Sequence, residues 1–180
     1  MSYFINFLTI FRILAASFIF ILLMYPSGYL LALSLFLISS LTDYFDGYLA
    51  RKYSLESELG AILDPIADKI LILFVLIAIS INLSSYFIGF LSSIIIMREI
   101  WVSALRDFNA RNNNADKTKV TFLAKIKTSI QLLTILIYLV GLFINSMLVL
   151  IIGDIFLVLS TIITLYTGYI YTIQSVEKNL

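Results

Sequence analysis

The chain has no cysteine and no histidine among its 180 residues. Disulfide bonds and thiol chemistry are therefore excluded, as are the most common general base and transition-metal ligand in proteins. We expect any catalytic proton acceptor to be a carboxylate. Charge is also scarce, because charged residues make up 13% of the chain and the formal net charge is +1. Without a basic stripe to neutralise a phosphate backbone, nucleic acid is not expected as a partner.

Apolar residues, by contrast, make up 61% of the chain, and the mean hydropathy is +1.04. A soluble domain is usually about half apolar. Uncharged runs cover residues 13–42, 70–97, 128–153 and 155–176. Each run contains the roughly 20 residues that a helix needs to cross the hydrocarbon core of a bilayer. The composition predicts an all-α integral membrane protein.

Turn-forming residues divide the long apolar runs. Tyr25-Pro-Ser-Gly28 interrupts the first run, Asn82-Leu-Ser-Ser85 the second, and Asn145-Ser146 the third. We expect a six-transmembrane-helix bundle that forms one domain over residues 1–180. The predicted helices span about 6–24, 28–51, 60–81, 86–109, 120–144 and 148–175.

The distribution of basic residues predicts the orientation of these helices. The three breaks carry no charge, whereas Arg51-Lys52 and the segment 106–119 contain arginine and lysine. The positive-inside rule places these two basic connections in the cytoplasm. Both termini then face the cytoplasm too, as expected for a multi-pass protein of the cell (inner) membrane. The first residues, up to Phe11, have no basic region typical of a cleavable signal peptide.

Four aspartates, among the 11 acidic residues of the chain, lie in one stretch from Asp43 to Asp68. A spacing of three puts Asp43 and Asp46 on one helix face, and a spacing of four does the same for Asp64 and Asp68. Helices joined by the short loop 52–59 are expected to be antiparallel neighbours, so the two acidic faces can meet. Four carboxylates brought together must bind cations or share protons. Ligation by oxygen alone favours hard ions such as Mg²⁺ or Mn²⁺.

Two such ions would suit phosphoryl transfer, because they can clamp phosphate oxygens and neutralise developing charge. Gly47 leaves room for a ligand to approach the helix, and Arg51 is placed to contact a phosphate or a base. The pattern indicates a diphosphate substrate at the membrane surface. Two other interpretations are solvated helix-end charges and the cation pathway of a divalent-cation transporter. Transport sites, however, usually lie near the bilayer midplane rather than at one edge.

The aspartate stretch also carries a family resemblance. Asp43 to Asp68 match the pattern Asp-x2-Asp-Gly-x2-Ala-Arg-x8-Gly-x3-Asp-x3-Asp without departure. In this the chain resembles the CDP-alcohol phosphotransferase family. The resemblance implies a six-helix homodimeric membrane enzyme that joins a CDP-linked donor, usually CDP-diacylglycerol, to an alcohol and releases CMP.

The same resemblance implies a role for each residue of the pattern. Asp43 and Asp64 would bridge two divalent cations, Asp46 would ligate one, and Asp68 would ligate the other. Asp68 would also be the proton acceptor. The residues implied at the CDP moiety are Gly47, Arg51 and Ser57.

The first predicted helix opens with Asn6-Phe-Leu-Thr9-Ile-Phe-Arg12. Asparagine and threonine are common at helix starts, and an arginine here can extend its charged end to the lipid headgroups. The segment also resembles the Asn-x-Leu-Thr-x-x-Arg opening of the family's glycerophospholipid branch. That resemblance implies contacts of Asn6 and Thr9 with CDP-diacylglycerol.

Four further cations lie at a similar depth on adjacent predicted helices: Arg98, Arg106, Lys125 and Lys127. Together they predict a pocket for an anionic acceptor. The other interpretations are a buried Arg98–Glu99 ion pair and anchoring of the lysines at the cytoplasmic surface. The Lys-x-Lys-Thr-x-x-Gln segment that begins at Lys125 resembles the branch of the family that uses glycerol 3-phosphate. Inositol phosphate, serine and phosphatidylglycerol are the alternative acceptors.

Overall fold

The computed structural model describes the backbone of residues 2–53, 58–112 and 122–176. Side chains are described for these residues except 2–8, 43–53, 58–62, 64–65 and 176. The described part contains α-helices and one short 3-10 helix but no strand. The helices are α1 (Ser2–Leu22), η1 (Pro26–Gly28), α2 (Tyr29–Tyr53), α3 (Glu58–Asn82), α4 (Tyr86–Arg111), α5 (Phe122–Phe143) and α6 (Met147–Val176). The all-helical prediction and its six long helices are confirmed.

Three tight turns join the helices at one end of the bundle, which we call the turn end. The 3-10 helix Pro26–Gly28 lies between α1 and α2. After α3, Ser84 adopts a left-handed backbone with φ of 48°, and the Ser85 N–H donates to the Ser80 carbonyl at 3.0 Å. Asn145 repeats this geometry after α5 with φ of 52°. These two turns are Schellman-type helix ends, in which a left-handed residue stops the helix and reverses the chain.

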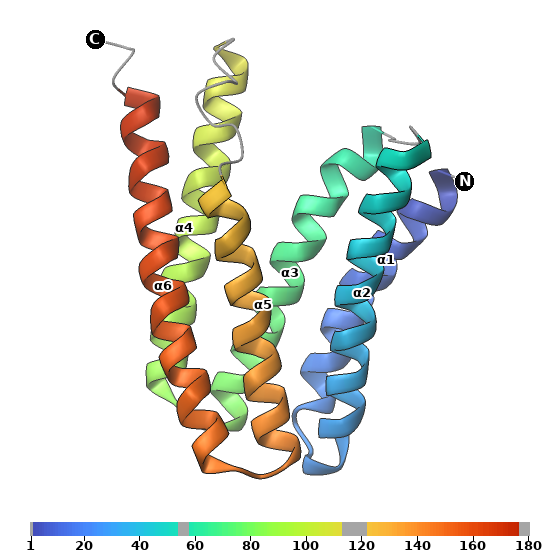
Figure 1. The fold of residues 1–180 in the computed structure, drawn as a ribbon, viewed down its shortest axis with the longest axis vertical. Coiled ribbons are helices and arrows are strands. Elements are labelled where there is room, and N and C mark those ends of the chain that lie inside the picture. Colours follow the sequence, from blue (N-terminus) through green and yellow to red (C-terminus); the bar gives the residue numbers. More distant parts are fainter. Residues whose placement is uncertain (1, 54–57, 113–121, 177–180) are drawn as a thin grey trace.

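The helices form two groups that diverge away from the turn end (Figure 1). In one group α1 packs against both α2 and α3, and in the other α6 packs against α4 and α5. Two helices join the groups, because α3 also packs against α4 and α5, and α2 also packs against α5. The beginning of α1 and the end of α6 both lie at the opposite end, which we call the open end (Figure 1).

Helices α2 and α3 run in opposite directions, as predicted for helices joined by a short loop (Figure 1). The contact between α2 and α3 is less extensive than the sequence predicted. Within the described residues, α2 and α3 are not among the helix pairs with extensive contact, and α1 packs against each of them instead. In the described backbone, α2 ends and α3 begins at the open end (Figure 1).

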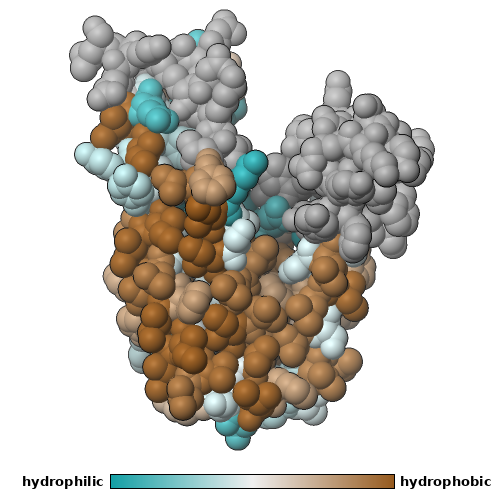
Figure 2. Space-filling model, in the orientation of Figure 1, coloured by the Kyte–Doolittle hydropathy of each residue, from teal (hydrophilic) through white to brown (hydrophobic). Residues whose placement is uncertain are grey.

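The outside of the bundle is apolar over most of its length, and Figure 2 shows a broad hydrophobic body below a hydrophilic hollow. Large side chains such as Phe18, Ile100 and Met147 are exposed. Three described helical segments are long and apolar enough to cross a membrane, namely Tyr86–Arg111, Phe122–Phe143 and Met147–Ser175. Shorter apolar stretches are Thr9–Leu22 and Pro26–Thr42. A continuous apolar exterior of this extent indicates a membrane protein.

Near the turn end, a polar contact fastens α5 to α6. The Tyr138 hydroxyl is fully buried and donates to Asp154 Oδ1 at 2.6 Å. Gly153 lies against the Tyr138 ring, and a Cβ at this position would come within 2.8 Å of the ring carbons. The half-buried carboxylate of α6 is thereby satisfied near the turn end.

Candidate active site

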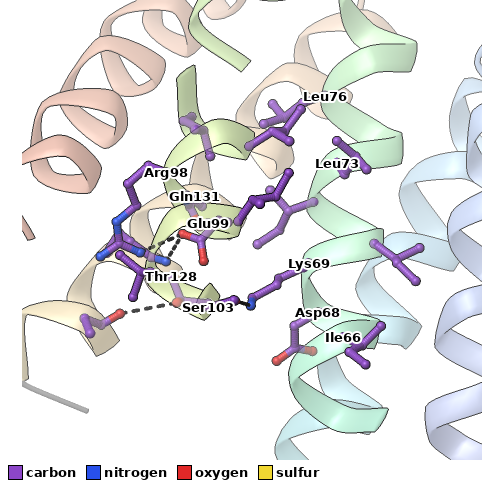
Figure 3. A pocket seen from close by; sticks show the side chains of 18 of the residues that line it. Ile66, Asp68, Lys69, Leu73, Leu76, Arg98, Glu99, Ser103, Thr128 and Gln131 are labelled. Atoms are coloured by element: carbon purple, nitrogen blue, oxygen red, sulfur yellow. Dashed lines mark hydrogen bonds and ion pairs between the residues drawn. The ribbon is translucent and has the colours of Figure 1, made fainter. Parts of the chain in front are cut away.

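A cavity of about 450 Å³ lies between α3, α4 and α5. Its deeper wall is apolar and includes Ile72, Leu76 and Ile95. Figure 3 shows the polar side chains of the three helices pointing into the same space. The polar and charged residues that line it are Asp68, Lys69, Arg98, Glu99, Ser103, Arg106, Lys127, Thr128 and Gln131. The cavity therefore combines an apolar floor with a charged mouth.

Glu99 is the centre of the charge cluster. Its Oε1 accepts from Arg98 Nη1 at 3.0 Å and also from Lys127 Nζ. Arg98 and Lys127 are only 4% and 6% exposed. A buried cation is costly unless it is paired. One carboxylate therefore makes it possible for two cations from different helices to lie side by side.

Helix α6 forms the support behind the arginines. Thr167 Oγ1 accepts from Arg98 Nη2 at 2.7 Å. The ring centroid of Tyr171 lies 5.9 Å from the guanidinium carbon of Arg98 and 5.5 Å from that of Arg106, within the range of cation–π attraction. Gly168 provides the necessary space, since a Cβ there would lie 3.0 Å from Arg98 Cγ.

Asp68 lies at the edge of the same cavity and is paired with Arg12 of α1. The Arg12 Nη1 to Asp68 Oδ1 distance is 2.6 Å, and the exposed fractions of the two side chains are 0% and 37%. Arg12 is therefore fully buried and does not extend to the headgroups. Thr9, one turn earlier on α1, is also fully buried. The ion pair fixes the Asp68 carboxylate while leaving part of its surface accessible from the cavity.

The structure brings together four of the residues predicted for the site, because Asp68, Arg98, Arg106 and Lys127 line one cavity. Lys125 is exposed and is not part of the lining. Thr9 is fully buried and is not part of the lining either. Six further predicted residues have a helical backbone, but their side chains lie outside the described ones: Asn6, Asp43, Asp46, Gly47, Arg51 and Asp64. Ser57 lies outside the described residues altogether.

The aspartates remain suited to a hard divalent cation in the chemistry of their donors. The described side chains contain no group of three or more potential acidic metal ligands, since only Asp68 of the four is among them. The backbone places Asp43 and Asp46 in α2, and Asp64 and Asp68 in α3. Asp68 shows that at least one carboxylate of this set faces the charged cavity.

Several residues of the cavity were not assigned from the sequence. Lys69 and Ser103 line it, Arg12 holds Asp68, and Thr167 and Tyr171 support the arginines. Lys69 directly follows Asp68 in the sequence, and this position was the one feature that could have indicated a role at the site. Threonine and tyrosine in an apolar helix resemble ordinary packing residues, so nothing in the sequence of α6 indicated its role.

Comparison with known proteins agrees with this arrangement. Residues 4–167 match the CDP-alcohol phosphatidyltransferase family. A CDP-diacylglycerol–glycerol-3-phosphate 3-phosphatidyltransferase from Blochmanniella floridana is 37% identical over 174 residues, which cover 94% of this chain and 90% of that protein. A protein of the same name from Rickettsia bellii is 39% identical over 170 residues, with 92% and 91% covered. One from Cereibacter sphaeroides is 40% identical over 141 residues, with 76% and 62% covered. The chain therefore belongs to the CDP-alcohol phosphatidyltransferase family.

Proposed function

We propose that the protein is a phosphatidylglycerophosphate synthase. It transfers the phosphatidyl group of CDP-diacylglycerol to glycerol 3-phosphate and produces phosphatidylglycerol phosphate and CMP. The observation that carries this proposal is the excess of positive charge in the cavity beside Asp68. The names of the relatives agree with the same pair of substrates.

The described lining of the cavity contains four cations, Lys69, Arg98, Arg106 and Lys127, but only two carboxylates, Asp68 and Glu99. Asp68 is paired with Arg12, which does not line the cavity. The Nε groups of Arg98 and Arg106 are buried and have no hydrogen-bond partner among the described residues. Buried donors of this kind are normally satisfied. A phosphate group supplies both the negative charge and the acceptors, whereas serine has no net charge and would not offset the excess of cations.

The donor substrate is assigned to the neighbouring helices. In this proposal Asn6, Thr9, Gly47, Arg51 and Ser57 bind CDP-diacylglycerol. Helix α1 supports this placement, because Thr9 and Arg12 lie one turn apart and Arg12 contacts Asp68. The acceptor and donor sites then meet at Asp68.

In the reaction, the cations of the cavity hold the phosphate of glycerol 3-phosphate and thereby position its 1-hydroxyl near Asp68. Asp68 accepts the hydroxyl proton, the oxygen bonds to the phosphorus that carries diacylglycerol, and the bond to CMP breaks. Two divalent cations, Mg²⁺ or Mn²⁺, bound by the carboxylates of Asp43, Asp46, Asp64 and Asp68, would neutralise the charge that develops on the phosphate oxygens. Arg12 keeps the Asp68 carboxylate in place.

The membrane topology is part of the proposal. Six spanning helices would place the neutral turns outside and the open end, with its charged cavity, at the cytoplasmic surface. The common position of the start of α1 and the end of α6 supports an even number of crossings (Figure 1). Glycerol 3-phosphate, a soluble anion, would then enter from the cytoplasm.

The direct experiment measures CMP release from CDP-diacylglycerol by purified protein in detergent with a panel of acceptors. We expect release with glycerol 3-phosphate and little with serine, inositol phosphate or phosphatidylglycerol. Asp68→Asn should reduce turnover by at least about 100-fold, because it removes the proton acceptor. Near-normal release by this variant would refute the role of Asp68. Ion flux into liposomes without CMP release would refute the transferase and favour a divalent-cation transporter.

A further inference from the structure

Lys69 is hydrogen-bonded to a hydroxyl group, whereas most other cations at the cavity are paired with a carboxylate. Glu99 accepts from Arg98 and Lys127, and Asp68 accepts from Arg12. Lys69 Nζ donates instead to the hydroxyl of Ser103, and no carboxylate is paired with it among the described residues. A hydroxyl orients an ammonium but does not neutralise its charge. The positive charge of Lys69 is therefore available to an anion in the cavity.

The position of the ammonium supports this interpretation. Glu99, Ser103 and Arg106 follow one another at spacings of four and three on α4, so they share one helix face. Lys69 extends across the cavity from α3 to Ser103, the middle member of this row (Figure 3). Its ammonium consequently lies between the Glu99 cluster on one side and Arg106 on the other, next in sequence to the Asp68 carboxylate.

The chemistry of the side chain fits a phosphate ligand. An ammonium has three donors, and Ser103 uses one of them. The two others can be donated to phosphate oxygens while Ser103 continues to hold the group. The flexible stem of lysine also allows its charge to follow a ligand that enters. The exposed Lys125 lies outside the cavity lining and does not have this geometry.

We propose that Lys69 binds the phosphate of the acceptor and that Ser103 positions it for this contact. The inference rests on the proposed function, since it takes glycerol 3-phosphate as the acceptor. Lys69 would favour phosphorylated acceptors, because an acceptor without phosphate would leave its charge uncompensated in a cavity that already contains excess positive charge.

The test compares the KM for each substrate in Lys69→Met, Lys69→Arg and wild-type protein. We expect Lys69→Met to raise the KM for glycerol 3-phosphate by about 10- to 100-fold, as for the loss of a charge-assisted hydrogen bond. The KM for CDP-diacylglycerol should change less than about twofold on the same reasoning. Lys69→Arg keeps the charge and should recover most of the affinity. The matched control is Arg111→Met, which removes an exposed cation of α4 that lies outside the cavity lining.

Ser103→Asp provides an independent variant that retains Lys69. The new carboxylate would pair with the ammonium, so the KM for glycerol 3-phosphate should again rise by about tenfold or more. A thermal unfolding transition establishes that each variant is folded. If Lys69→Met does not fold, the KM of Ser103→Asp tests the role of Lys69. An unchanged KM for glycerol 3-phosphate, an equal rise for both substrates, or a loss confined to kcat would overturn the proposal.

Calorimetric titration with inorganic phosphate separates this inference from the proposed function. If the wild type binds phosphate and Lys69→Met binds it at least about tenfold more weakly, Lys69 is an anion ligand. That result would stand even if glycerol 3-phosphate supported no CMP release, which would refute only the proposed function. Equal binding of phosphate by both proteins would refute the role of Lys69.

Discussion

Replacing Glu99 with glutamine should both destabilise the protein and make its stability depend on phosphate. Glu99→Gln removes the one carboxylate that accepts from both Arg98 and Lys127, whose side chains are 5% and 8% exposed. At a separation of about 4 Å and an effective dielectric constant of about 20, each attraction amounts to roughly 4 kcal/mol. Breaking a buried pair by removing one partner usually costs about 3–5 kcal/mol.

The Glu99 side chain is 19% exposed and adjoins a cavity that water can enter. We therefore expect a loss of about 2–4 kcal/mol in the free energy of unfolding, near the lower end of the range for buried pairs. For a chain of this size, that loss corresponds to a decrease of roughly 5–15 °C in Tm. Differential scanning fluorimetry of the purified protein in detergent measures the decrease.

The matched control is Asp107→Asn on the same helix. Asp107 pairs with Arg111 at 2.9 Å, but their side chains are 62% and 77% exposed. Exposed pairs at this helical spacing contribute only about 0.3–0.5 kcal/mol. The Tm of this variant should therefore stay within about 2 °C of the wild type.

Phosphate provides the second readout of Glu99→Gln. An added anion can replace the missing carboxylate between the two cations, so inorganic phosphate should raise the Tm of Glu99→Gln more than that of the wild type. If Glu99→Gln were as stable as Asp107→Asn, or if phosphate stabilised all three proteins equally, Glu99 would not be the residue that holds the cations together.

Three further outcomes are expected. Tyr138→Phe should lower the free energy of unfolding by about 1–3 kcal/mol in a denaturation measurement, because Asp154 loses its buried donor, while the KM for glycerol 3-phosphate stays unchanged; a changed KM would contradict the separation of the two regions. Gly168→Ala should raise that KM, since the added Cβ would lie 3.0 Å from Arg98 Cγ and the arginine side chain would have to shift; an unchanged KM would show that the position of Arg98 does not limit binding of the acceptor. Removing divalent cations with EDTA should abolish CMP release, and Mg²⁺ or Mn²⁺ should restore it; full activity in excess EDTA would exclude the metal-assisted step.

The helices were predictable because the bilayer imposes a simple rule on the sequence. The uncharged runs predicted which parts of the chain form apolar helices. Turn-forming residues such as Pro26, Ser84 and Asn145 predicted where one helix ends and the next begins. The main difference is at the beginning of the chain, where α1 starts at Ser2 rather than near residue 6. Local chemistry was therefore sufficient for the positions of the helices.

The cavity was only partly predictable, because it depends on how each helix is rotated. Depth along the membrane correctly grouped Arg98, Arg106 and Lys127, but depth does not say which way a side chain points. Residues two apart on a helix point to nearly opposite sides, and Lys125 accordingly lies outside the cavity that Lys127 lines. The two-residue separation of Lys125 and Lys127 was enough to predict that only one of the two lysines faces the cavity.

Other contacts had no local signal. Arg12 meets Asp68 across 56 positions of sequence, and Arg98 meets Thr167 across 69. Such pairs form only when particular helices pack together, and the order of packing does not follow the order of the chain. The contact of α4 with α6 is an example, since α5 lies between them in sequence.

The left-handed turn at Ser84 lies far from the charged cavity, but it helps to set the distance between the helices that line the cavity. Lys69 is about 15 residues before this turn and Glu99 about 15 after it, so each lies roughly 20 Å along its helix from the turn. The two helices α3 and α4 are joined at this turn. A change of about 5° in the angle between them would move Lys69 relative to Glu99 by roughly 2 Å. A change in the turn at Ser84 would alter the width of the cavity between the two helices, and with it the proposed binding of the acceptor phosphate, without changing any residue of the lining.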